Sequence, residues 1–308
     1  MKGSLESLAG ALAYHASMLS DEARNRSFAR AVAATVKPGM RVLDLGAGCG
    51  PWAILAARHG AREVFAVERN PLLASLLRAT IAEEGLASQI TVVEGDSREQ
   101  ELPGTFDLIV SETIGPQAFD EDIVEILADA RPRWLSPGGR VLPARLGLVA
   151  APIRLPPGHR GAPELGLGLP LRLDALRQLQ RQIPSALSLD ASVELLAPPT
   201  TLVMADLTSA LRRPDLSQLA ARWTIADGAA VDAIALWVRA VLAEDIVLET
   251  FACPSWTQTA FPVERLPAGP GELRWELDHP ASAWQVRFGD VEHVHSPQLL
   301  AAWLHARR

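Results

Sequence analysis

Between residues 41 and 143, short runs of apolar and β-branched residues alternate with longer amphipathic runs. The short runs predict strands at 41–45, 63–68, 89–95, 106–112 and 139–143, and the long runs predict helices at 51–60, 71–85 and 122–135. Pro51 suits the first turn of its helix and Gly60 suits a helix end. Because strands and helices alternate in this way in doubly wound sheets, the region is predicted to form a Rossmann-like α/β domain.

The pattern changes after Pro143, where proline-rich and glycine-rich stretches separate short alternating runs. The runs LRWEL at 273–277 and WQVRF at 284–288 place apolar residues at every second position, as half-buried strands do. We therefore expect a β-sandwich or barrel-like domain in this half. The stretch at about 156–187 joins a proline-rich and glycine-rich loop to a helical run, and we expect it to project from the β domain.

Length and composition narrow the class of protein. A chain of 308 residues is long enough for about two domains. Hydrophobic residues make up 48% and charged residues 21%, a balance that excludes a largely disordered chain. The net charge of −7 lacks the basic excess that neutralises a phosphate backbone, so we expect no nucleic-acid partner, while a cationic substrate is compatible with it.

The two cysteines, Cys49 and Cys253, supply neither a disulfide framework nor the paired spacing of a zinc site, so no metal is predicted. Such thiols are typical of a reduced compartment, and we expect a cytoplasmic protein. Glu6 and His15 interrupt the apolar core that a signal peptide needs, and no later run stays apolar for the roughly 20 residues of a membrane span. Neither a signal peptide nor a membrane anchor is expected.

A glycine-rich turn, GAGCG, follows the first predicted strand and contains Gly46, Gly48 and Gly50. Ligands bind at this turn in doubly wound sheets, where glycine lets the backbone approach them closely. Asp44, just before the turn, offers a carboxylate to a cationic or hydroxyl group. A nicotinamide-binding turn carries glycine at the sixth position, where this chain has Pro51. The GxGxG form instead resembles motif I of class I methyltransferases, which implies S-adenosyl-L-methionine as the cofactor.

Further polar residues stand at the ends of the next two predicted strands. Glu68 ends the second strand, where an acid can accept hydrogen bonds from both ribose hydroxyls. Asp96 and Ser97 follow the third strand, where class I methyltransferases usually bind adenine. The order and spacing of these residues agree with a cofactor site along one edge of the sheet.

The sequence HASMLSDEAR at 15–24 matches the His-x-x-Met-Leu-x-Asp-x-x-Arg pattern that protein arginine methyltransferases carry on a helix before motif I. This resemblance implies that Arg24 holds the cofactor carboxylate, a role that suits a planar bidentate donor. It also implies that His15 and Met18 line the cofactor and the reacting centre. Residues 1–30 are therefore expected to form a helical segment that covers the cofactor.

The sequence SETIGPQAFDED resembles the double-glutamate loop of the same family, with Glu112 directly after the fourth strand and Glu121 nine residues later. Two carboxylates can hold a guanidinium through paired charge-assisted hydrogen bonds and aim one of its nitrogens at the reactive methyl group. Either carboxylate can also accept a proton. Glu112 is in addition expected to contact the cofactor.

Farther along, CPSWTQTAF resembles the family's Thr-His-Trp loop and retains Trp256, which the resemblance places at the active site. Ser255 stands where the family has histidine. Ile123 stands where many members have a second active-site methionine, and Thr113 and Pro116 replace aromatic residues of the double-glutamate loop. These differences predict a reshaped acceptor pocket.

The predicted organisation is a helical segment at 1–30, a Rossmann-like cofactor domain at 31–143 and a barrel-like substrate domain at 144–308. Arginine methyltransferases dimerise through an arm that projects from the barrel. The resemblance therefore implies that the stretch at about 156–187 is a shortened arm of a homodimer.

The leading functional prediction is methyl transfer from S-adenosylmethionine to a guanidino nitrogen of free arginine, a small metabolite or a peptide. Transfer to an indole carbon (C3) or to an amine of a biosynthetic intermediate is an alternative, because an indole N–H needs only one carboxylate. A non-catalytic cofactor-binding subunit is a third, although such a subunit would be expected to lose its active-site acids, and Glu112 and Glu121 are both present.

Overall fold

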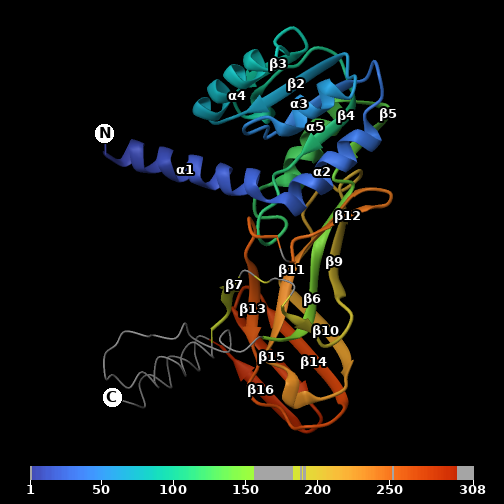
Figure 1. Cartoon of the computed structure of the whole chain (residues 1–308). Coiled ribbons are helices and arrows are strands. Elements are labelled where there is room, and N and C mark those ends of the chain that lie inside the picture. The colour runs from blue at the N-terminus through green and yellow to red at the C-terminus, as the bar shows by residue number, and fades with distance from the viewer. Residues whose placement is uncertain (1, 156–182, 188, 190–191, 252, 297–308) are drawn as a thin grey trace.

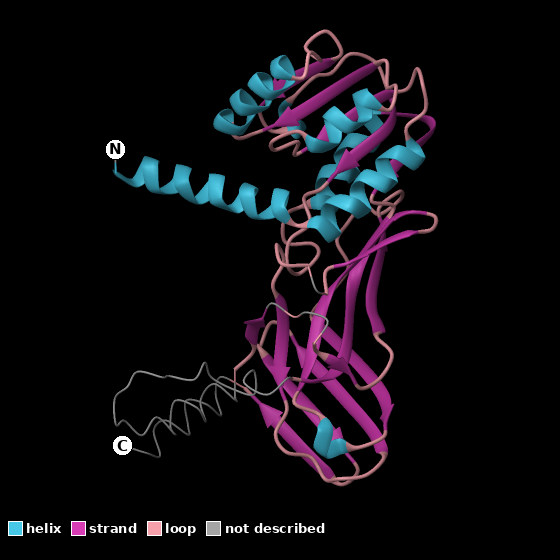
Figure 2. Ribbon diagram, in the orientation of Figure 1, coloured by secondary structure: helices cyan, strands magenta, loops and turns pink. Residues whose placement is uncertain are grey.

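The structure is a computed structural model that describes residues 2–155, 183–187, 189, 192–251 and 253–296. An α/β part and a β-rich part lie end to end, joined by long strands of the second part (Figures 1 and 2). Most of the stretch predicted to form an arm lies outside the described residues. In the described part of the chain, no helix has the length and hydropathy that crossing a bilayer requires.

The α/β part contains five α-helices and five parallel strands among its described residues. The helices are α1 (Lys2–Ser20), α2 (Glu22–Thr35), α3 (Pro51–Arg58), α4 (Pro71–Glu83) and α5 (Ile123–Trp134). The strands are β1 (Arg41–Leu45), β2 (Glu63–Glu68), β3 (Ile90–Glu94), β4 (Phe106–Ser111) and β5 (Leu135–Leu142), and a short 3-10 helix spans Ser97–Glu99. The predicted alternation of strands and helices is confirmed.

The parallel sheet has the strand order β3-β2-β1-β4-β5, so β1 lies in the middle between β2 and β4. From β1 the chain first adds β2 and β3 on one side. It then crosses back and adds β4 and β5 on the other side of β1, so the strand order reverses between β1 and β4. Ligands of doubly wound sheets bind at this switch point, beyond the carboxyl ends of the strands. The glycine turn after β1 lies there.

Local sequence signals explain where two of these helices begin. The side chain of Asn70 caps α4 by accepting from the N–H of Leu72 at 3.0 Å, and Pro71 occupies the first turn. Gly50, with φ +81°, precedes Pro51 at the start of α3. The left-handed backbone at that point is one that glycine adopts without strain.

The N-terminal segment differs from its prediction. The pattern at 15–24 was expected on one helix, but α1 ends at Ser20 and α2 begins at Glu22. Asp21 between them has extended backbone angles and caps α2 by accepting from the N–H of Arg24 at 3.0 Å. The second helix also continues to Thr35, beyond the expected boundary at residue 30. α1 projects outward from the junction of the two parts (Figure 1).

The β-rich part contains antiparallel strands in two sheets. Its strands are β6 (Arg145–Arg154), β7 (Ser185–Leu187), β8 (Glu194–Leu195), β9 (Thr200–Asp206), β10 (Gln218–Ile225), β11 (Ala233–Ala243), β12 (Ile246–Glu249), β13 (Gln258–Pro262), β14 (Gly271–Asp278), β15 (Ala283–Phe288) and β16 (Val291–His295). One sheet has the order β7-β13-β11-β6-β8, with β12 on β11 and β9 on β6, and the other has the order β10-β14-β15-β16. The predicted barrel-like domain is present, although its described strands do not close into a barrel.

Burial follows the sequence pattern of the second sheet, because the residues of β10 alternate between exposed and buried along the whole strand. Trp275 of β14 is fully buried and packs against Phe261, with ring centroids 5.3 Å apart. Trp284 of β15 packs against the same phenylalanine at 5.5 Å. These aromatic side chains join the two sheets through a common core.

Several contacts fix the β-rich part against the α/β part. The buried guanidinium of Arg131 on α5 donates to the carbonyl oxygens of Leu207 and Ala210. α2 packs against β11 and β12 of the β-rich part. On the α/β side, Phe28 anchors α2 by stacking on Trp52 of α3, with ring centroids 4.9 Å apart. These contacts hold α2 and α5 of the first part against the second part.

Candidate functional site

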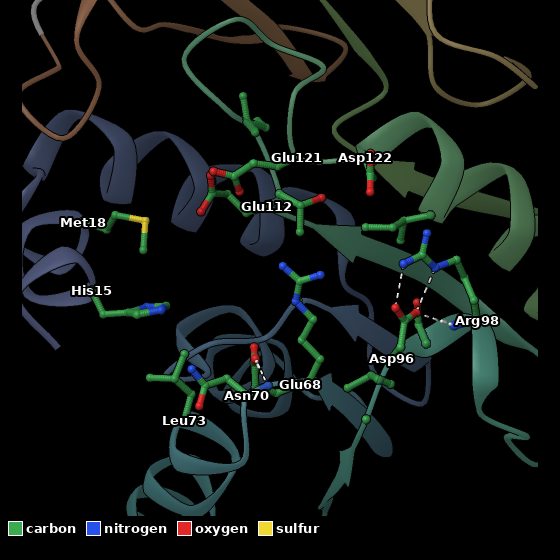
Figure 3. Close-up of a pocket in the computed structure, with 18 of the residues that line it drawn as sticks. His15, Met18, Glu68, Asn70, Leu73, Asp96, Arg98, Glu112, Glu121 and Asp122 are labelled. Carbon is green, nitrogen blue, oxygen red and sulfur yellow. Dashed lines mark hydrogen bonds and ion pairs between the residues drawn. The ribbon is translucent and has the colours of Figure 1, made fainter. Parts of the chain in front are cut away.

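A cavity of about 470 Å³ lies at the carboxyl edge of the parallel sheet. In Figure 3, Glu112 and Glu121 lie on one side of it, His15 and Met18 approach from α1, and Glu68 lies opposite the two glutamates. It is lined by Tyr14, His15, Met18, Gly46, Val67, Glu68, Arg69, Asn70, Leu73, Gly95, Asp96, Ser97, Arg98, Glu112, Thr113, Ile114, Asp120, Glu121, Asp122 and Ile126. The pocket is large enough for a small-molecule ligand.

Of the three predicted glycines in the turn, Gly46 lines the pocket, whereas Gly48 and Gly50 do not. Gly46 and Gly48 have φ values of +72° and +56°, which side-chain-bearing residues rarely adopt. A Cβ atom added to Gly46 would lie 2.6 Å from Thr113, and one added to Gly48 would lie 3.0 Å from His15. Gly46 itself lines the pocket, so its lack of a side chain keeps that space open.

Gly50 has a different role from the one predicted for it. It does not line the pocket, and a Cβ atom there would collide with Leu77 of α4. Its lack of a side chain therefore serves the packing of the turn against α4.

Glu68 connects the end of β2 to the glycine turn. Its Oε2 accepts from the N–H of Gly48 and its Oε1 from the N–H of Asn70, both at 2.7 Å. Each carboxylate oxygen has a second lone pair, so both can still accept a hydroxyl of a ligand. Glu68 is buried, which makes it a fixed acceptor in the pocket wall.

Asp96 and Ser97 line the pocket after β3, as the cofactor prediction places them. The carboxylate of Asp96 is already engaged, since it caps the short 3-10 helix and binds Arg98 through Nε at 2.9 Å and Nη2 at 2.6 Å. These bonds from Arg98 lower the pKa of Asp96 to about 2. The carboxylate of Asp96 is thus already paired with a protein side chain, that of Arg98.

Asp44 lies under the turn and is fully buried. Its Oδ2 accepts from the N–H of Ala53 at 3.0 Å, while its Oδ1 has no hydrogen-bond partner among the described residues. Burial raises the pKa of Asp44 to about 7. A buried acceptor with an unused oxygen leaves room for a hydrogen bond from a ligand or a water molecule.

Arg24 lies behind the pocket and forms an ion pair with Glu112 in which both side chains are almost fully buried. Its Nη1 donates to Asn25 at 2.9 Å, and its guanidinium carbon lies 5.4 Å and 5.8 Å from the ring centroids of Trp52 and Trp256. The Nε atom has no hydrogen-bond partner among the described residues. Arg24 is therefore held in place, and its Nε–H is not used by the described residues.

The two predicted glutamates lie on the same side of the pocket (Figure 3). Burial, opposed by Arg24, raises the pKa of Glu112 to about 7, and the charge of Glu121 adds to this rise. Burial and the neighbouring Asp120 also raise the pKa of Glu121. A cation placed between the two carboxylates would relieve both effects.

α1 supplies three side chains to the pocket: Tyr14, His15 and Met18. Tyr14 is hydrogen-bonded to Glu121, and burial followed by the charges of the two glutamates raises its pKa to about 12. Burial lowers the pKa of His15, which favours the neutral imidazole. The sequence did not single out Tyr14, although it directly precedes the matched motif.

The β-rich part supports the double-glutamate loop, defined here as residues 112–122. Trp256 was predicted to be catalytic, but it is buried and does not line the pocket. Its indole N–H donates to the carbonyl oxygen of Ile114 in the loop at 2.9 Å. The Nε2 of His279 also lies 2.9 Å from the side-chain oxygen of Gln117.

The far end of this loop is held by Arg213, which binds Asp122 at 3.0 Å and Glu125 of α5 at 2.8 Å. Ser255 supports the break between α1 and α2. Its hydroxyl donates to Asp21 at 2.6 Å and its backbone N–H donates to the same carboxylate oxygen at 3.1 Å. Ser255 therefore bonds an acid of the predicted motif from the position where the family pattern has histidine.

The structure thus brings His15, Met18, Glu68, Glu112 and Glu121 to one pocket, together with Gly46, Asp96 and Ser97. Arg24 and Asp44 lie behind its wall, while Gly50 and Trp256 have packing and supporting positions. The sequence reasoning missed Tyr14, Arg69, Asp120 and Asp122. Each of these four residues is adjacent in sequence to a predicted site residue or motif residue, and this adjacency was the signal that could have identified them as pocket residues.

Comparison with protein families agrees with this geometry. The family model of the TRM5/TYW2 methyltransferase domain matches residues 14–131, which contain α1 from Tyr14 onward, the glycine turn and the double-glutamate loop. The chain therefore contains a methyltransferase domain.

Curated relatives are arginine methyltransferases. The chain is 36% identical over 135 residues to the arginine N(omega)-methyltransferase of Streptomyces achromogenes subsp. streptozoticus, and 33% identical over 141 residues to protein arginine N-methyltransferase 6 of Danio rerio. These matches cover 42% and 45% of this chain and 37% and 40% of the relatives. The matched region thus spans less than half the length of either relative.

Solved structures share the fold over nearly the whole chain. The Trypanosoma brucei PRMT1 enzyme–prozyme heterotetrameric complex with AdoHcy has a TM-score of 0.70 at 19% identity, covering 91% of this chain and 96% of that one. Arabidopsis thaliana protein arginine methyltransferase 10, in an open conformation, has a TM-score of 0.68 at 21% identity, covering 92% and 99%. The predicted resemblance to the arginine methyltransferases and the predicted fold class are confirmed.

Proposed function

We propose that this chain is an S-adenosylmethionine-dependent methyltransferase that transfers the methyl group to a guanidino nitrogen. The observation that carries the proposal is the position of Glu112 and Glu121, two carboxylates on one side of a pocket whose opposite side carries Glu68 (Figure 3). The matched methyltransferase domain and the arginine methyltransferase relatives support the same reaction.

The residues of the pocket fit this cofactor. Gly46 leaves open a space that a side chain would fill, and Glu68 keeps lone pairs for the ribose hydroxyls. The unused Nε–H of Arg24 suits the cofactor carboxylate while the terminal nitrogen stays on Glu112. The unused oxygen of Asp44 suits a donor on the methionine portion. When bound, S-adenosylmethionine supplies a methyl group activated by its sulfonium.

Glu112 and Glu121 would bind the acceptor guanidinium through its N–H groups and orient one nitrogen toward the reactive methyl. Burial is the main cause of the raised pKa of both carboxylates, and a guanidinium between them would lower both pKa values. A carboxylate with a pKa near 7 is also a suitable proton acceptor at neutral pH. Tyr14 would hold Glu121 in position through its hydroxyl.

Turnover of S-adenosylmethionine with a labelled methyl group tests this proposal. We expect label in arginine or an arginine derivative, and none in indole or in primary amines without a guanidine. Glu112→Gln and Glu121→Gln should each slow transfer by about ten-fold or more, since each removes a charge-assisted hydrogen bond from the acceptor. Label in an indole with only one of the two variants impaired would instead support an indole acceptor.

We also propose a cytoplasmic location and a homodimer. The location is supported by Cys49 and Cys253, which are both free thiols. The dimer is supported by the likeness to arginine methyltransferases, and light scattering of the purified chain tests it. A mass equal to that of a single chain at working concentration would contradict the dimer.

A further inference from the structure

Arg69 lines the pocket and is not used by the proposed function. Two other cationic side chains near the pocket have acidic partners, since Arg98 binds Asp96 and Arg24 binds Glu112. Arg69, in contrast, has no hydrogen-bond or ion-pair partner among the described residues, and it is exposed. Its guanidinium donors are therefore available to a ligand.

The position of Arg69 relates it to the acceptor as well as to the cofactor. It directly follows Glu68 at the end of β2. The pKa of Glu121 is raised by burial and by Asp120, and the charge of Arg69 opposes this rise. The pKa of Asp96 is lowered mainly by Arg98, with a smaller contribution from Arg69. The charge of Arg69 thus acts on Glu121, which is proposed to bind the acceptor, and on Asp96 at the far end of the pocket.

The charges around the pocket are arranged for a ligand with two opposite charges. Glu112 and Glu121 would take the positive guanidinium, and Arg69 would remain as a positive group without a direct ion-pair partner among the described residues. The α-carboxylate of a free amino acid is separated from the guanidinium by a flexible carbon chain and would provide that partner. Inside a peptide the same carbon belongs to a neutral amide, which would leave the donors of Arg69 with a weaker partner.

We propose that Arg69 binds the carboxylate of a free amino-acid acceptor, so that the substrate is arginine or a close analogue with a free carboxylate rather than an arginine residue in a protein. This inference rests on the proposed function. Arg69 binds a part of the acceptor that is remote from the methyl transfer, so its contribution is made equally before and during the reaction. Its loss is therefore expected to raise KM more than it lowers kcat.

Steady-state rates with arginine, argininamide and agmatine test the assignment, because the amide neutralises the carboxylate and agmatine lacks it. The wild-type protein should prefer arginine to either compound by about ten-fold or more in kcat/KM. Arg69→Gln should remove this preference by weakening arginine alone, and Arg69→Lys should restore part of it. Arg62→Gln is the matched control, because Arg62 is exposed near the other end of β2 and does not line the pocket.

Calorimetric titration with S-adenosylhomocysteine completes the test. The affinity of Arg69→Gln for this compound should equal that of the wild-type protein. A loss of cofactor affinity, or equal loss of activity toward arginine and argininamide, would assign Arg69 to the cofactor or to the fold and overturn the inference. Transfer to argininamide or to peptides as fast as to arginine would overturn it and leave the proposed function standing, whereas no transfer to any guanidine would remove both.

Discussion

Replacing Glu112 with glutamine removes a negative charge from a buried position and keeps the shape of the side chain. Burial raises the pKa of Glu112 from 4.5 to about 7 even though Arg24 opposes the rise. The folded protein therefore holds this proton more tightly than the unfolded chain does. The stabilisation is complete below about pH 4.5 and is lost as the pH rises through about 7. A pKa difference of this size corresponds to about 3 kcal/mol.

Glutamine resembles the protonated acid and cannot ionise, so Glu112→Gln should avoid this loss. At pH 8 we expect its free energy of unfolding to exceed that of the wild-type protein by up to about 3 kcal/mol, although methyl transfer is slowed. Near pH 5, where Glu112 is mostly protonated, the two proteins should have similar stability. Urea denaturation followed by tryptophan fluorescence at both pH values measures the difference.

Glu121→Gln is the matched control, because Glu121 is less buried than Glu112 and, unlike it, has no ion pair among the described residues. It should lose activity with a much smaller change in stability than Glu112→Gln. The reasoning is refuted if Glu112→Gln is several kcal/mol less stable than the wild-type protein at pH 8. That result would mean that the ion pair with Arg24 outweighs the cost of burying the carboxylate.

Three further substitutions test other parts of the site. Gly48→Val should abolish cofactor binding in a folded protein, because the valine side chain would contact His15 and strain a left-handed backbone. Calorimetry measures the cofactor affinity, and an unchanged affinity would show that the turn is not part of the site. Arg24→Ala should weaken cofactor binding by about ten-fold or more. In the wild-type protein the bound cofactor should protect the residues before Arg24 from proteolysis, and this protection should be absent from the variant. Equal protection in both proteins would contradict a role in binding. Trp256→Phe removes the N–H that holds Ile114, so kcat should fall while cofactor affinity stays constant, and a parallel loss of affinity would count against a purely supporting role.

The α/β part was predictable because short apolar runs such as those of β2 and β4 alternate with amphipathic runs, and because Pro51 and Pro71 mark helix starts. The β-rich part was predicted only as a class. β6 pairs with β11 although 78 residues separate the two strands, as Val149 opposite Trp237 illustrates, and no local pattern encodes such a partner. The break at Asp21 was missed because an acid that caps one helix also fits inside a longer helical pattern.

In the site, the spacing of Glu112 and Glu121 identified two residues that share the pocket, because both belong to one loop. The ion pair between Arg24 and Glu112 joins residues far apart in the chain, so the sequence assigned Arg24 to the cofactor alone. Trp256 was placed among the catalytic residues because a motif gives a residue type and not the direction in which the side chain points. These assignments depend on tertiary packing.

The double-glutamate loop belongs to the first half of the chain, yet Trp256, His279 and Arg213 of the second half hold it in place. Mutations in the β-rich part are therefore expected to move this loop and change acceptor choice, although none of its described residues lines the pocket. The two halves would then diversify under separate selective pressures, with the second half free to follow new acceptors. For enzyme engineering, libraries directed at the residues that support this loop are a route to altered acceptor specificity with the methyl donor retained.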